Sequence, residues 1–562
     1  MTALESWAEE LKLRYISGES SIFLLYGNVR DQYPFHNENG TTDYLYIHDY
    51  LDRFLQKTKE DILYYNISEG VSFLNASTKS DKLVKLRQRG LTEYGSDATG
   101  VLKMAERMIL KKDSNSAIIL DYLEMIIPMA SIQFMENQDK ANLVRLERWT
   151  SNPQFFDRDS IVILITEHIS DVHRRFVSCP QLATIELKLP ESEQRRAYVD
   201  TVKTDEIRFS EDMSQAAFSD FCAGLTLIQI GALLRRSEQS QAPITFANVS
   251  QRKKSIIEQE CHGLVEFVSP KHNFTHVGGM APLKKELNRV AKAIKDGRRN
   301  QVPMGMLFVG PMGTGKTYIA EAFAGESGLT CLKFKNFREK WVGSTESNLE
   351  KILQVVNGLG YVLLIIDEAD RSMNSSGSDG GTSSRVIARI KEFMSNTKHR
   401  GRVVVLMMTN RPDKIDIDLK RPGRLDYKIP FFFPQDEETR EAVLSALIRK
   451  NTIQLEEETD VNSIAEQTAG YSAAELEAVL LRALNIASEE ERMSINNDDL
   501  IKAATDVIPS RDTKMLEYME LLAVFESSSK EMLIEKYRDM STEDVHQHLG
   551  RLRSELGIYN RA

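Results

Sequence analysis

Short apolar runs alternate with helix-like segments through the second half of the chain, from Phe274 to about Ser510. Three of these runs, Met306 to Val309, Tyr361 to Ile366 and Val403 to Met408, have the length of one buried strand. Strands that alternate with helical stretches predict a parallel sheet covered by helices. The second half is therefore predicted to be an α/β domain.

After about Ile464 the pattern becomes purely helical. Ser472-Ala473-Ala474-Glu475 has the form of a capping box and predicts an amphipathic helix through Leu484. The stretch from Asp512 to Ala562 is helical again, and Ser541 to Asp544 predicts the cap of a final helix. The apolar stripe of this last stretch is expected to pack back onto the lid formed by the preceding helices, or else to bind an adaptor protein.

The first half repeats the second at an offset of roughly 245 residues. Four segments match in order: Ile118 to Asp121 with Leu364 to Asp367, Ile161 to Glu167 with Val403 to Asn410, Leu189 to Arg195 with Phe433 to Arg440, and Ala223 to Thr226 with Ala469 to Ser472. The matches favour a duplicated module. The alternative is an unrelated α/β domain whose strands coincide by chance.

At 562 residues the chain is too long for a single core. We expect two tandem modules, each a parallel sheet flanked by helices and followed by a small helical lid. The first would occupy residues 1–265 and the second residues 266–510, with its sheet core in 266–435 and its lid in 436–510. A C-terminal helical extension would follow in 511–562.

The formal net charge of −10 argues against a broad nucleic-acid-binding surface. No apolar run approaches the roughly 18 residues of a membrane span, and the N-terminus has no signal-peptide pattern. The four cysteines are scattered without metal-ligand spacing, which is typical of buried thiols in a reducing compartment. These features predict a cytoplasmic protein without membrane insertion.

The most specific motif is Gly310-Pro311-Met312-Gly313-Thr314-Gly315-Lys316-Thr317, which lies between a predicted strand and a helix-like run from Tyr318. Strand, glycine-rich loop and helix form the context of a phosphate-binding P-loop. The glycines let several backbone N–H groups point at one anion, and the dipole of the following helix adds to them. Lys316 can reach the β- and γ-phosphates, and the Thr317 hydroxyl can bind Mg²⁺. The motif predicts binding of a nucleoside triphosphate.

Polar side chains at the ends of two further strands could supply the chemistry of hydrolysis. The run Val362 to Ile366 is followed by Asp367 and Glu368. Asp367 would hold Mg²⁺ through its water shell, and Glu368 would polarise the attacking water. The next strand is followed by Asn410, whose amide could orient the same water or touch the γ-phosphate.

Arg421-Pro422-Gly423-Arg424 follows shortly after. An arginine carries a permanent charge and a bidentate fork, which suit it to stabilise a developing phosphate anion. A position at the edge of a subunit would place Arg421 and Arg424 against the γ-phosphate of a neighbour, as fingers supplied in trans.

The order of these motifs resembles the AAA ATPases, in particular the group that contains valosin-containing protein, the proteasomal ATPases and katanin. The resemblance covers about Phe274 to Ser510 and includes Val277-Gly278-Gly279, Thr409 to Asp413 and Gly470 to Leu476. It implies an ATP-hydrolysing ring, usually a hexamer, with active sites between subunits and with ATP and Mg²⁺ as cofactors.

The resemblance also implies a role for each matching residue. The catalytic set would be Lys316, Asp367, Glu368, Asn410, Arg421 and Arg424, with Thr317 and Asp367 at the metal. The nucleotide would be held by Val277, Gly278, Pro311, Met312, Gly313, Thr314, Gly315, Lys316, Thr317, Tyr318, Ala473 and Ala474.

Lys340-Trp341-Val342-Gly343-Ser344 resembles the first pore loop of this family. In such rings the aromatic side chain, here Trp341, faces the central channel with Val342 and grips an extended polypeptide. The alternative is that Trp341 packs only on its own domain. Ser344 departs from the family, which often has a glutamate there. A second pore loop at Gly377 to Gly381 carries no aromatic residue, so its grip should be weak.

The first half lacks the elements of catalysis. Its strand Ile22 to Gly27 is followed by Asn28-Val29-Arg30-Asp31, without Gly-Lys-Thr. Asp121 is followed by Tyr122 instead of a glutamate, and the two finger positions fall on a serine and a glutamine. Because the Gly-Lys-Thr loop, the glutamate and the finger arginines are all missing, we predict a degenerate AAA module. The tandem arrangement resembles that of bacterial and plastid tandem AAA proteins.

Three functions fit these features to different degrees. The main hypothesis is a homo-oligomeric, chaperone-like ring that remodels, threads or disassembles a protein substrate of unknown identity. The alternative is a nucleotide-gated scaffold or assembly factor with slow ATP turnover. A nucleic-acid motor is opposed by the acidic charge and the aromatic pore motif, and a membrane-bound AAA protease by the absence of a His-Glu-x-x-His helix and of a membrane-spanning run.

Overall fold

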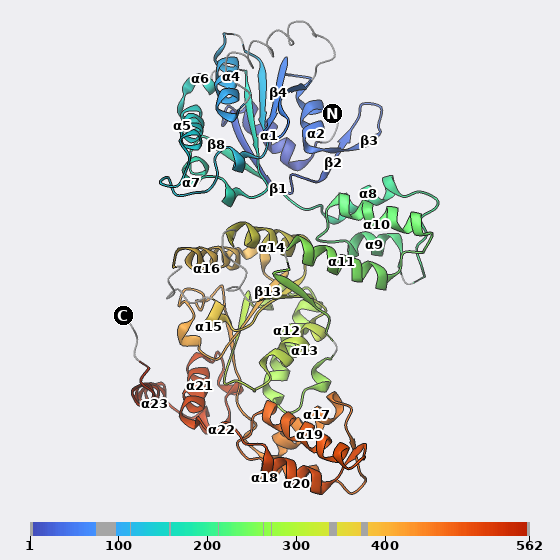
Figure 1. The fold of residues 1–562 in the computed structure, drawn as a ribbon, viewed down its shortest axis with the longest axis vertical. Helices are drawn as coiled ribbons and strands as arrows, with labels where there is room; N and C mark the ends of the chain where they lie inside the picture. The colour runs from blue at the N-terminus through green and yellow to red at the C-terminus, as the bar shows by residue number, and fades with distance from the viewer. Residues whose placement is uncertain are drawn as a thin grey trace. The chain divides into compact units, whose positions relative to one another are not determined.

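The computed structural model describes residues 4–74, 97–112, 114–156, 159–211, 213–261, 263–270, 272–335, 345–372 and 380–558. They divide into two compact units, one that runs to Ile257 and includes most of helix α14 (Thr345–Leu359), and one made of the remainder from Glu258 onward. Figure 1 labels many of the elements of both units. Within the described residues, no helix is long and apolar enough to cross a membrane.

The first unit is built on a six-stranded sheet with the strand order β5-β4-β6-β7-β1-β8. Neighbouring strands are parallel except for β4 and β5. The strands are β1 (Ile22–Gly27), β4 (Asp61–Asn66), β5 (Gly70–Leu74), β6 (Ser116–Leu120), β7 (Ile161–Ile165) and β8 (Leu182–Leu187), and a separate hairpin is formed by β2 (Gln32–His36) and β3 (Thr42–Tyr46).

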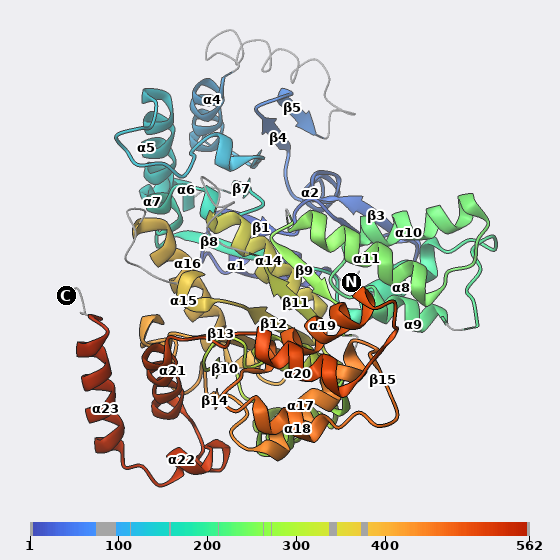
Figure 2. The ribbon, with the colours of Figure 1, turned by 60° about the horizontal axis from the view of Figure 1, so that its bottom comes forward.

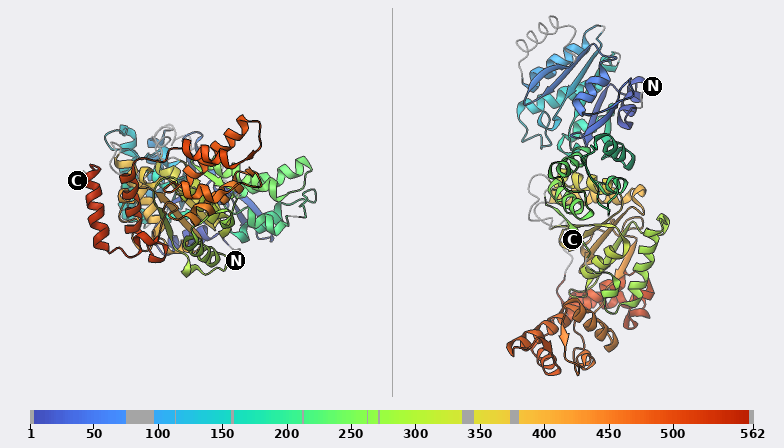
Figure 3. Two further views of the ribbon diagram at one scale, coloured as in Figure 1. Left: turned by 90° about the horizontal axis from the view of Figure 1, so that it is seen from below. Right: turned by 90° about the vertical axis from the view of Figure 1, so that its right-hand side faces the viewer.

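Alternate residues of β1 enter two apolar clusters, Ile22 and Leu24 in one and Phe23 and Leu25 in the other. Since successive side chains of a strand point to opposite faces, the sheet has a core on each side, covered by helices (Figure 3). The helices beside the sheet are α1 (Ser6–Ile16), α2 (Ile47–Leu55), α4 (Ala98–Leu110), α5 (Asn137–Ser151), α6 (Pro153–Phe156) and α7 (Arg174–Val177). The helices α8 (Ser192–Val202), α9 (Gln215–Phe221), α10 (Leu227–Ser240) and α11 (Phe246–Glu260) form the helical lid of this unit.

The second unit has a six-stranded sheet with the order β14-β10-β13-β12-β11-β9, in which β9 alone runs antiparallel to its neighbour. The strands are β9 (Val265–Val268), β10 (Gly305–Val309), β11 (Thr330–Phe334), β12 (Val362–Ile366), β13 (Val403–Thr409) and β14 (Tyr427–Pro430). The predicted parallel sheet is confirmed, and strands β10, β12 and β13 are buried along their whole length. The helices beside this sheet are α12 (Ala281–Lys295), α13 (Lys316–Ser327), α15 (Ala369–Ser372) and α16 (Gly380–Ser395).

The two sheets have one topology. Strands β8, β1, β7, β6, β4 and β5 take the places of β14, β10, β13, β12, β11 and β9. The lids repeat as well, because Arg195 Nε donates to the Ser219 carbonyl at 2.8 Å and Arg440 Nε to the Ala465 carbonyl at 2.6 Å. The predicted duplication is therefore confirmed over an unrelated α/β domain.

The lid of the second unit contains α17 (Glu437–Lys450), α18 (Val461–Gln467), α19 (Ala473–Glu489) and α20 (Asn497–Asp506). The capping box at Ser472 is confirmed, and α19 runs past the predicted end. The expectation of purely helical structure is wrong at β15 (Gln454–Leu455) and β16 (Ser494–Ile495), which pair in parallel. Strands of two residues are too short to carry a periodicity.

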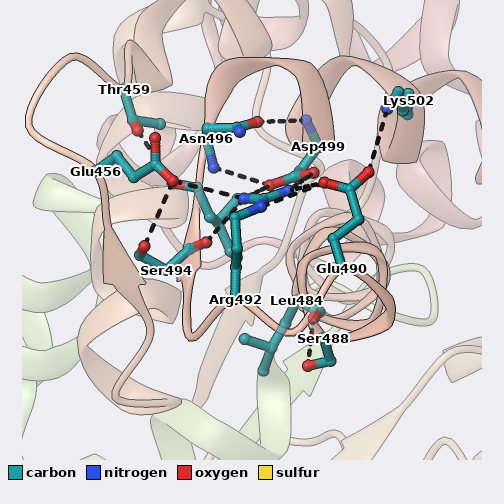
Figure 4. A network of polar contacts seen from close by, with 11 residues as sticks. Glu456, Thr459, Leu484, Ser488, Glu490, Arg492, Ser494, Asn496, Asp499 and Lys502 are labelled. Carbon is teal, nitrogen blue, oxygen red and sulfur yellow. Dashed lines mark hydrogen bonds and ion pairs between the residues drawn. The ribbon is translucent and has the colours of Figure 1, made fainter.

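A polar network fixes the turn between α19 and α20 (Figure 4). The Arg492 guanidinium donates to both carboxylate oxygens of Asp499, at 2.8 and 2.7 Å, and to Glu490 at 2.8 Å. Asp499 has 1% of its side chain exposed, and it also caps its own helix by accepting from Asn496 N. These contacts join the turn to the first residues of α20.

The C-terminal extension contains α21 (Thr513–Glu526), α22 (Glu535–Arg538) and α23 (Thr542–Glu555). The expectation that its apolar stripe packs on the lid is wrong, because α21 packs against β14 and β10 of the sheet core (Figure 2). Phe432, which follows β14, joins Tyr518, Leu522 and Tyr537 in one apolar cluster. An amphipathic pattern predicts a buried face but does not identify the surface that buries it.

Candidate nucleotide site

A cavity of about 920 Å³ opens at the carboxyl ends of strands β10, β12 and β13 in the second unit. Ligands of open α/β sheets bind at this edge. Most of the predicted site residues line it, namely Met312, Gly313, Thr314, Gly315, Lys316, Thr317, Tyr318, Asp367, Glu368, Asn410, Ala473 and Ala474. A smaller adjoining cavity is lined by Val277, Gly278, Thr314, Gly315, Tyr318 and Ala473 among others.

The loop between β10 and α13 has the conformation that its glycines allow. Gly313 and Gly315 have φ values of 77° and 84°, in the left-handed region that other residues avoid. A Cβ atom on Gly310 would lie 2.2 Å from the Phe431 carbonyl oxygen, so only glycine fits against β14 there. Helix α13 begins at Lys316, and its free N–H groups and dipole favour an anion at this point.

The Lys316 ammonium is held inside the loop. It donates to the carbonyl oxygens of Gly310 and Pro311, at 2.8 and 2.7 Å, and to Asn410 Oδ1 at 2.8 Å. Burial lowers the pKa of Lys316 to about 8, while the carboxylates of Asp367 and Asp370 oppose this shift. The structure thus brings Lys316, at the start of α13, into direct contact with Asn410, which follows β13.

Oxygen donors meet beside Lys316. The Thr317 hydroxyl lies 3.4 Å from Asp367 Oδ2. A hydroxyl and a carboxylate are the hard oxygen donors that Mg²⁺ prefers, so these residues fit the predicted metal. Asp367 also accepts from the Lys333 ammonium at 3.0 Å, and sequence reasoning missed Lys333 because a lysine in a strand belongs to no motif.

Glu368 has a φ of 45°, a left-handed conformation that is uncommon outside glycine. The backbone N–H of Glu368 donates to Oδ1 of Asp367 at 2.9 Å. Tyr122 in the first unit repeats both features, with a φ of 54° and an N–H donated to Asp121 at 2.8 Å. The turn after this strand is thus common to both modules, whereas the side chain that it presents is not.

The lid closes the cavity from the opposite side. Ala474 N donates to the Gly313 carbonyl at 3.2 Å, which joins the start of α19 to the phosphate-binding loop. Gly278 lies against helix α17, since an added Cβ would be 2.2 Å from the Ala442 carbonyl oxygen. These contacts make the geometry of the pocket depend on the lid.

Arg421 and Arg424 do not line the pocket of their own chain. Arg421 is 69% exposed and contacts Asp418 at 3.0 Å. Arg424 donates to the Asp418 carbonyl at 2.8 Å and to Ser395 Oγ at 2.9 Å. Trp341 and Val342 lie outside the described residues, as does most of the Gly377 to Gly381 loop.

In the first unit, charged and polar side chains meet at the equivalent place. Arg30 donates to both oxygens of Asp121 at 2.8 Å, and its guanidinium stacks over the Tyr122 ring at 3.9 Å. Asp31 accepts from the N–H groups of Leu227 and Ile228, at 2.9 and 3.1 Å, at the start of α10. A carboxylate therefore occupies the helix N-terminus that corresponds to that of α19.

Comparison with known proteins agrees with this architecture. Residues 2–188 match the family model of the N-terminal Rossmann-like domain of AAA+ chaperones, and residues 193–262 that of their second helical domain. Residues 306–433 match the ATPase family associated with various cellular activities (AAA), and residues 458–502 match the AAA+ lid domain.

Similar curated proteins are ATP-dependent zinc metalloproteases named FtsH. The chain is 31% identical to FtsH of Pelobacter propionicus over 259 residues, which cover 44% of this chain and 41% of the relative. It is 30% identical to FtsH 2 of Salinibacter ruber over 318 residues, 54% of this chain and 45% of the relative. The chain thus spans less than half the length of these relatives.

The P-loop cavity, the lid and the duplicated sheet agree with the matched families along most of the chain. The protein therefore belongs to the AAA+ ATPase family, and its second module is an ATPase domain of that family.

Proposed function

We propose that this protein is a chaperone-like, cytoplasmic AAA+ ring in which ATP hydrolysis by the second module remodels a protein substrate. The observation that supports it best is the convergence of Lys316, Asp367 and Asn410 at one cavity closed by the lid. The domain limits 1–265, 266–510 and 511–562 belong to the same proposal.

Each pocket residue has a distinct task in this proposal. Lys316 and the N–H groups of the loop bind the phosphates, and Thr317 and Asp367 would hold Mg²⁺. When bound, Mg²⁺ supplies positive charge to the phosphate oxygens. Glu368 takes a proton from the attacking water, and Asn410 orients that water or the γ-phosphate. Val277, Gly278, Ala473 and Ala474 surround the base and ribose.

The site is completed by a second copy of the chain. Arg421 and Arg424 lie outside their own pocket, so they would act on the γ-phosphate bound by a neighbouring subunit. In a closed ring every subunit makes such a head-to-tail contact, and we propose a ring of six subunits. The first module would stabilise the ring or dock the substrate, without binding nucleotide itself.

The test is Glu368→Gln, which removes the base and leaves the phosphate-binding residues in place. We expect ATP binding to persist, turnover to fall by about 100-fold or more, and ATP-bound oligomers to accumulate. Mass photometry at micromolar concentration with saturating ATP would measure the oligomers, and Lys316→Ala would serve as the variant that cannot bind. A protein that remains monomeric would rule out the ring.

A second candidate is a nucleotide-gated scaffold with slow turnover. Lys333 favours it, because its ammonium pairs with Asp367 and must give way before a metal reaches that carboxylate. ATP binding would then switch interaction surfaces rather than drive repeated strokes. Pull-down with the Glu368→Gln protein and ATP should identify partners under either candidate.

A further inference from the structure

The segment that carries Arg421 and Arg424 is tied at both ends to one buried carboxylate. Lys420 precedes Arg421, and Lys428 lies in β14 just after the segment. Both ammonium groups contact Glu526, at the end of helix α21, and the distance from Lys428 Nζ to Glu526 is 2.9 Å. The Glu526 side chain is 7% exposed and that of Lys420 14% exposed.

Further contacts join α21 and its flanking residues to the same part of the chain. Ser528 Oγ accepts from Lys428 N at 2.8 Å, and Ser528 N donates to the Lys428 carbonyl at 3.0 Å. Tyr518, which is fully buried, donates to Asp413 at 3.3 Å. Figure 2 shows α21 beside β14, the strand that contains Lys428. The C-terminal extension thus holds the chain from just after Asn410 to β14.

Between its two ends the segment is held by contacts of Arg421 with Asp418 and of Arg424 with Asp418 and Ser395. Gly423 has a φ of 90°, and the residues from Arg421 to Gly423 are exposed. An arginine finger stabilises the transition state only at a defined position, because a displacement of about 1 Å costs much of the rate. The position of these arginines therefore depends on the ends of the segment as well as on the contacts that the two side chains make themselves.

We propose that Glu526 is a positioning residue for the arginine fingers, and that the C-terminal extension thereby controls the ATPase site of the neighbouring subunit. This inference rests on the proposed function, since it needs a site shared between subunits. Glu526 does not line the nucleotide cavity. It acts through Lys420 and Lys428, because its single carboxylate contacts both ammonium groups.

The first experiment compares Glu526→Gln and Glu526→Asp with the control Glu520→Gln. Glu520 is a buried carboxylate of the same helix that accepts from Tyr537 within the extension and from the backbone of Phe433, and neither Lys420 nor Lys428 is among these partners. We expect Glu526→Gln to lower ATP turnover by about tenfold or more, with unchanged affinity for nucleotide. Glu526→Asp keeps the charge, and hence the fold, but is too short to reach both lysines, so it should show an intermediate loss. Equal losses in the control would contradict the proposal.

Mixing of variant subunits distinguishes a displaced arginine finger from a damaged nucleotide pocket as the cause of lost turnover. A Glu368→Gln subunit cannot hydrolyse ATP but offers intact arginines to its neighbour. In a mixture with Glu368→Gln subunits, Glu526→Gln subunits should regain full turnover. The reference is the turnover of wild-type subunits in a separate mixture with Glu368→Gln subunits. Mixed with an Arg421→Ala/Arg424→Ala protein, Glu526→Gln subunits should regain none.

A reference mixture distinguishes failure of this inference from failure of the proposed function. Arg421→Ala/Arg424→Ala with Glu368→Gln should restore turnover if sites are shared between subunits. If that pair restores nothing, the shared site itself is wrong. If it does and Glu526→Gln with Glu368→Gln does not, Glu526 has no role in placing the fingers.

Discussion

At the scale of single residues, Lys333 and Asp367 form an ion pair inside the nucleotide pocket. The two groups lie 3.0 Å apart, with 28% and 29% of their side chains exposed. A partly exposed ion pair contributes about 0–1 kcal/mol. That is enough to change the occupancy of a weak metal site, but not enough to hold the pocket closed.

Lys333→Met should therefore make Asp367 easier for Mg²⁺ to reach. We expect the Mg²⁺ concentration for half-maximal binding of a fluorescent ATP analogue to fall about two- to fivefold, the equivalent of about 0.5–1 kcal/mol. Lys335→Met is a matched control, because Lys335 also lines the pocket but pairs with Glu266 at 3.9 Å. An equal shift in both variants would attribute the effect to general charge in the pocket.

The residues that sequence could predict are those whose chemistry depends on local spacing. Lys316 and Thr317 follow a glycine pattern that specifies the backbone around them. Lys333 and Glu526 act through partners that are distant in sequence, and either would look like an ordinary surface charge in a strand or a helix. Arg30 belongs to the same class, because its contact with Asp121 depends on the order of strands in the sheet.

At the scale of elements, the nucleotide cavity depends on close packing between the sheet core and the lid. Gly278→Ala would place a methyl group 2.2 Å from the Ala442 carbonyl oxygen of α17. We expect weaker nucleotide binding and a loss of about 1–3 kcal/mol in the free energy of unfolding of the second module, as for other overpacked sites.

Gly550→Ala provides the comparison for this variant. Gly550 is inside helix α23, and among the residues that the structure describes none has an atom within 4 Å of a Cβ added there. Alanine there should be neutral or raise the free energy of unfolding by up to about 1 kcal/mol. Denaturant titration of both variants, together with nucleotide titration, would measure the two effects. A Gly278→Ala protein as stable as wild type would mean that the lid adjusts freely.

The first module shows how an element can be retained after its chemistry is gone. Burial raises the pKa of Asp31, while Asn28 and the N–H groups of α10 oppose that shift. Arg30, which contacts Asp121, and Asp31, at the start of α10, lie where the second module has its phosphate-binding loop. We predict one nucleotide per chain, measured by isothermal titration calorimetry, and none in Lys316→Ala. A residual binding event in that variant would place a nucleotide in the first module.

Arg30→Ala would test the structural consequence of this replacement. Asp121 has 4% of its side chain exposed, so loss of its partner leaves a buried charge. Breaking such a pair from one side costs about 3–5 kcal/mol. We expect the first module to unfold at lower denaturant concentration, with the ATPase pocket of the second module intact.

At the scale of the whole molecule, the duplication of the module was predictable from the sequence, whereas the surface that the C-terminal extension covers was not. Repeated strands in matching order indicated two modules, and their common strand order confirms it. The surface beneath the C-terminal extension was not predictable, because an apolar helix face fits a sheet edge as well as a lid. Only the contacts of α21 with β14 identify the sheet core as the partner.

The choice between a threading motor and a nucleotide-gated scaffold depends on Trp341. A motor must grip its substrate at every stroke, and an aromatic side chain grips any polypeptide through apolar contact. Trp341→Ala should therefore leave ATP turnover within about twofold of wild type, since Trp341 belongs to no step of phosphoryl transfer. It should abolish unfolding of a tagged fluorescent substrate. Met493→Ala, at a residue 86% exposed in the lid, controls for loss of an exposed apolar side chain. Substrate processing that survives Trp341→Ala would favour the scaffold, because a switch needs no grip.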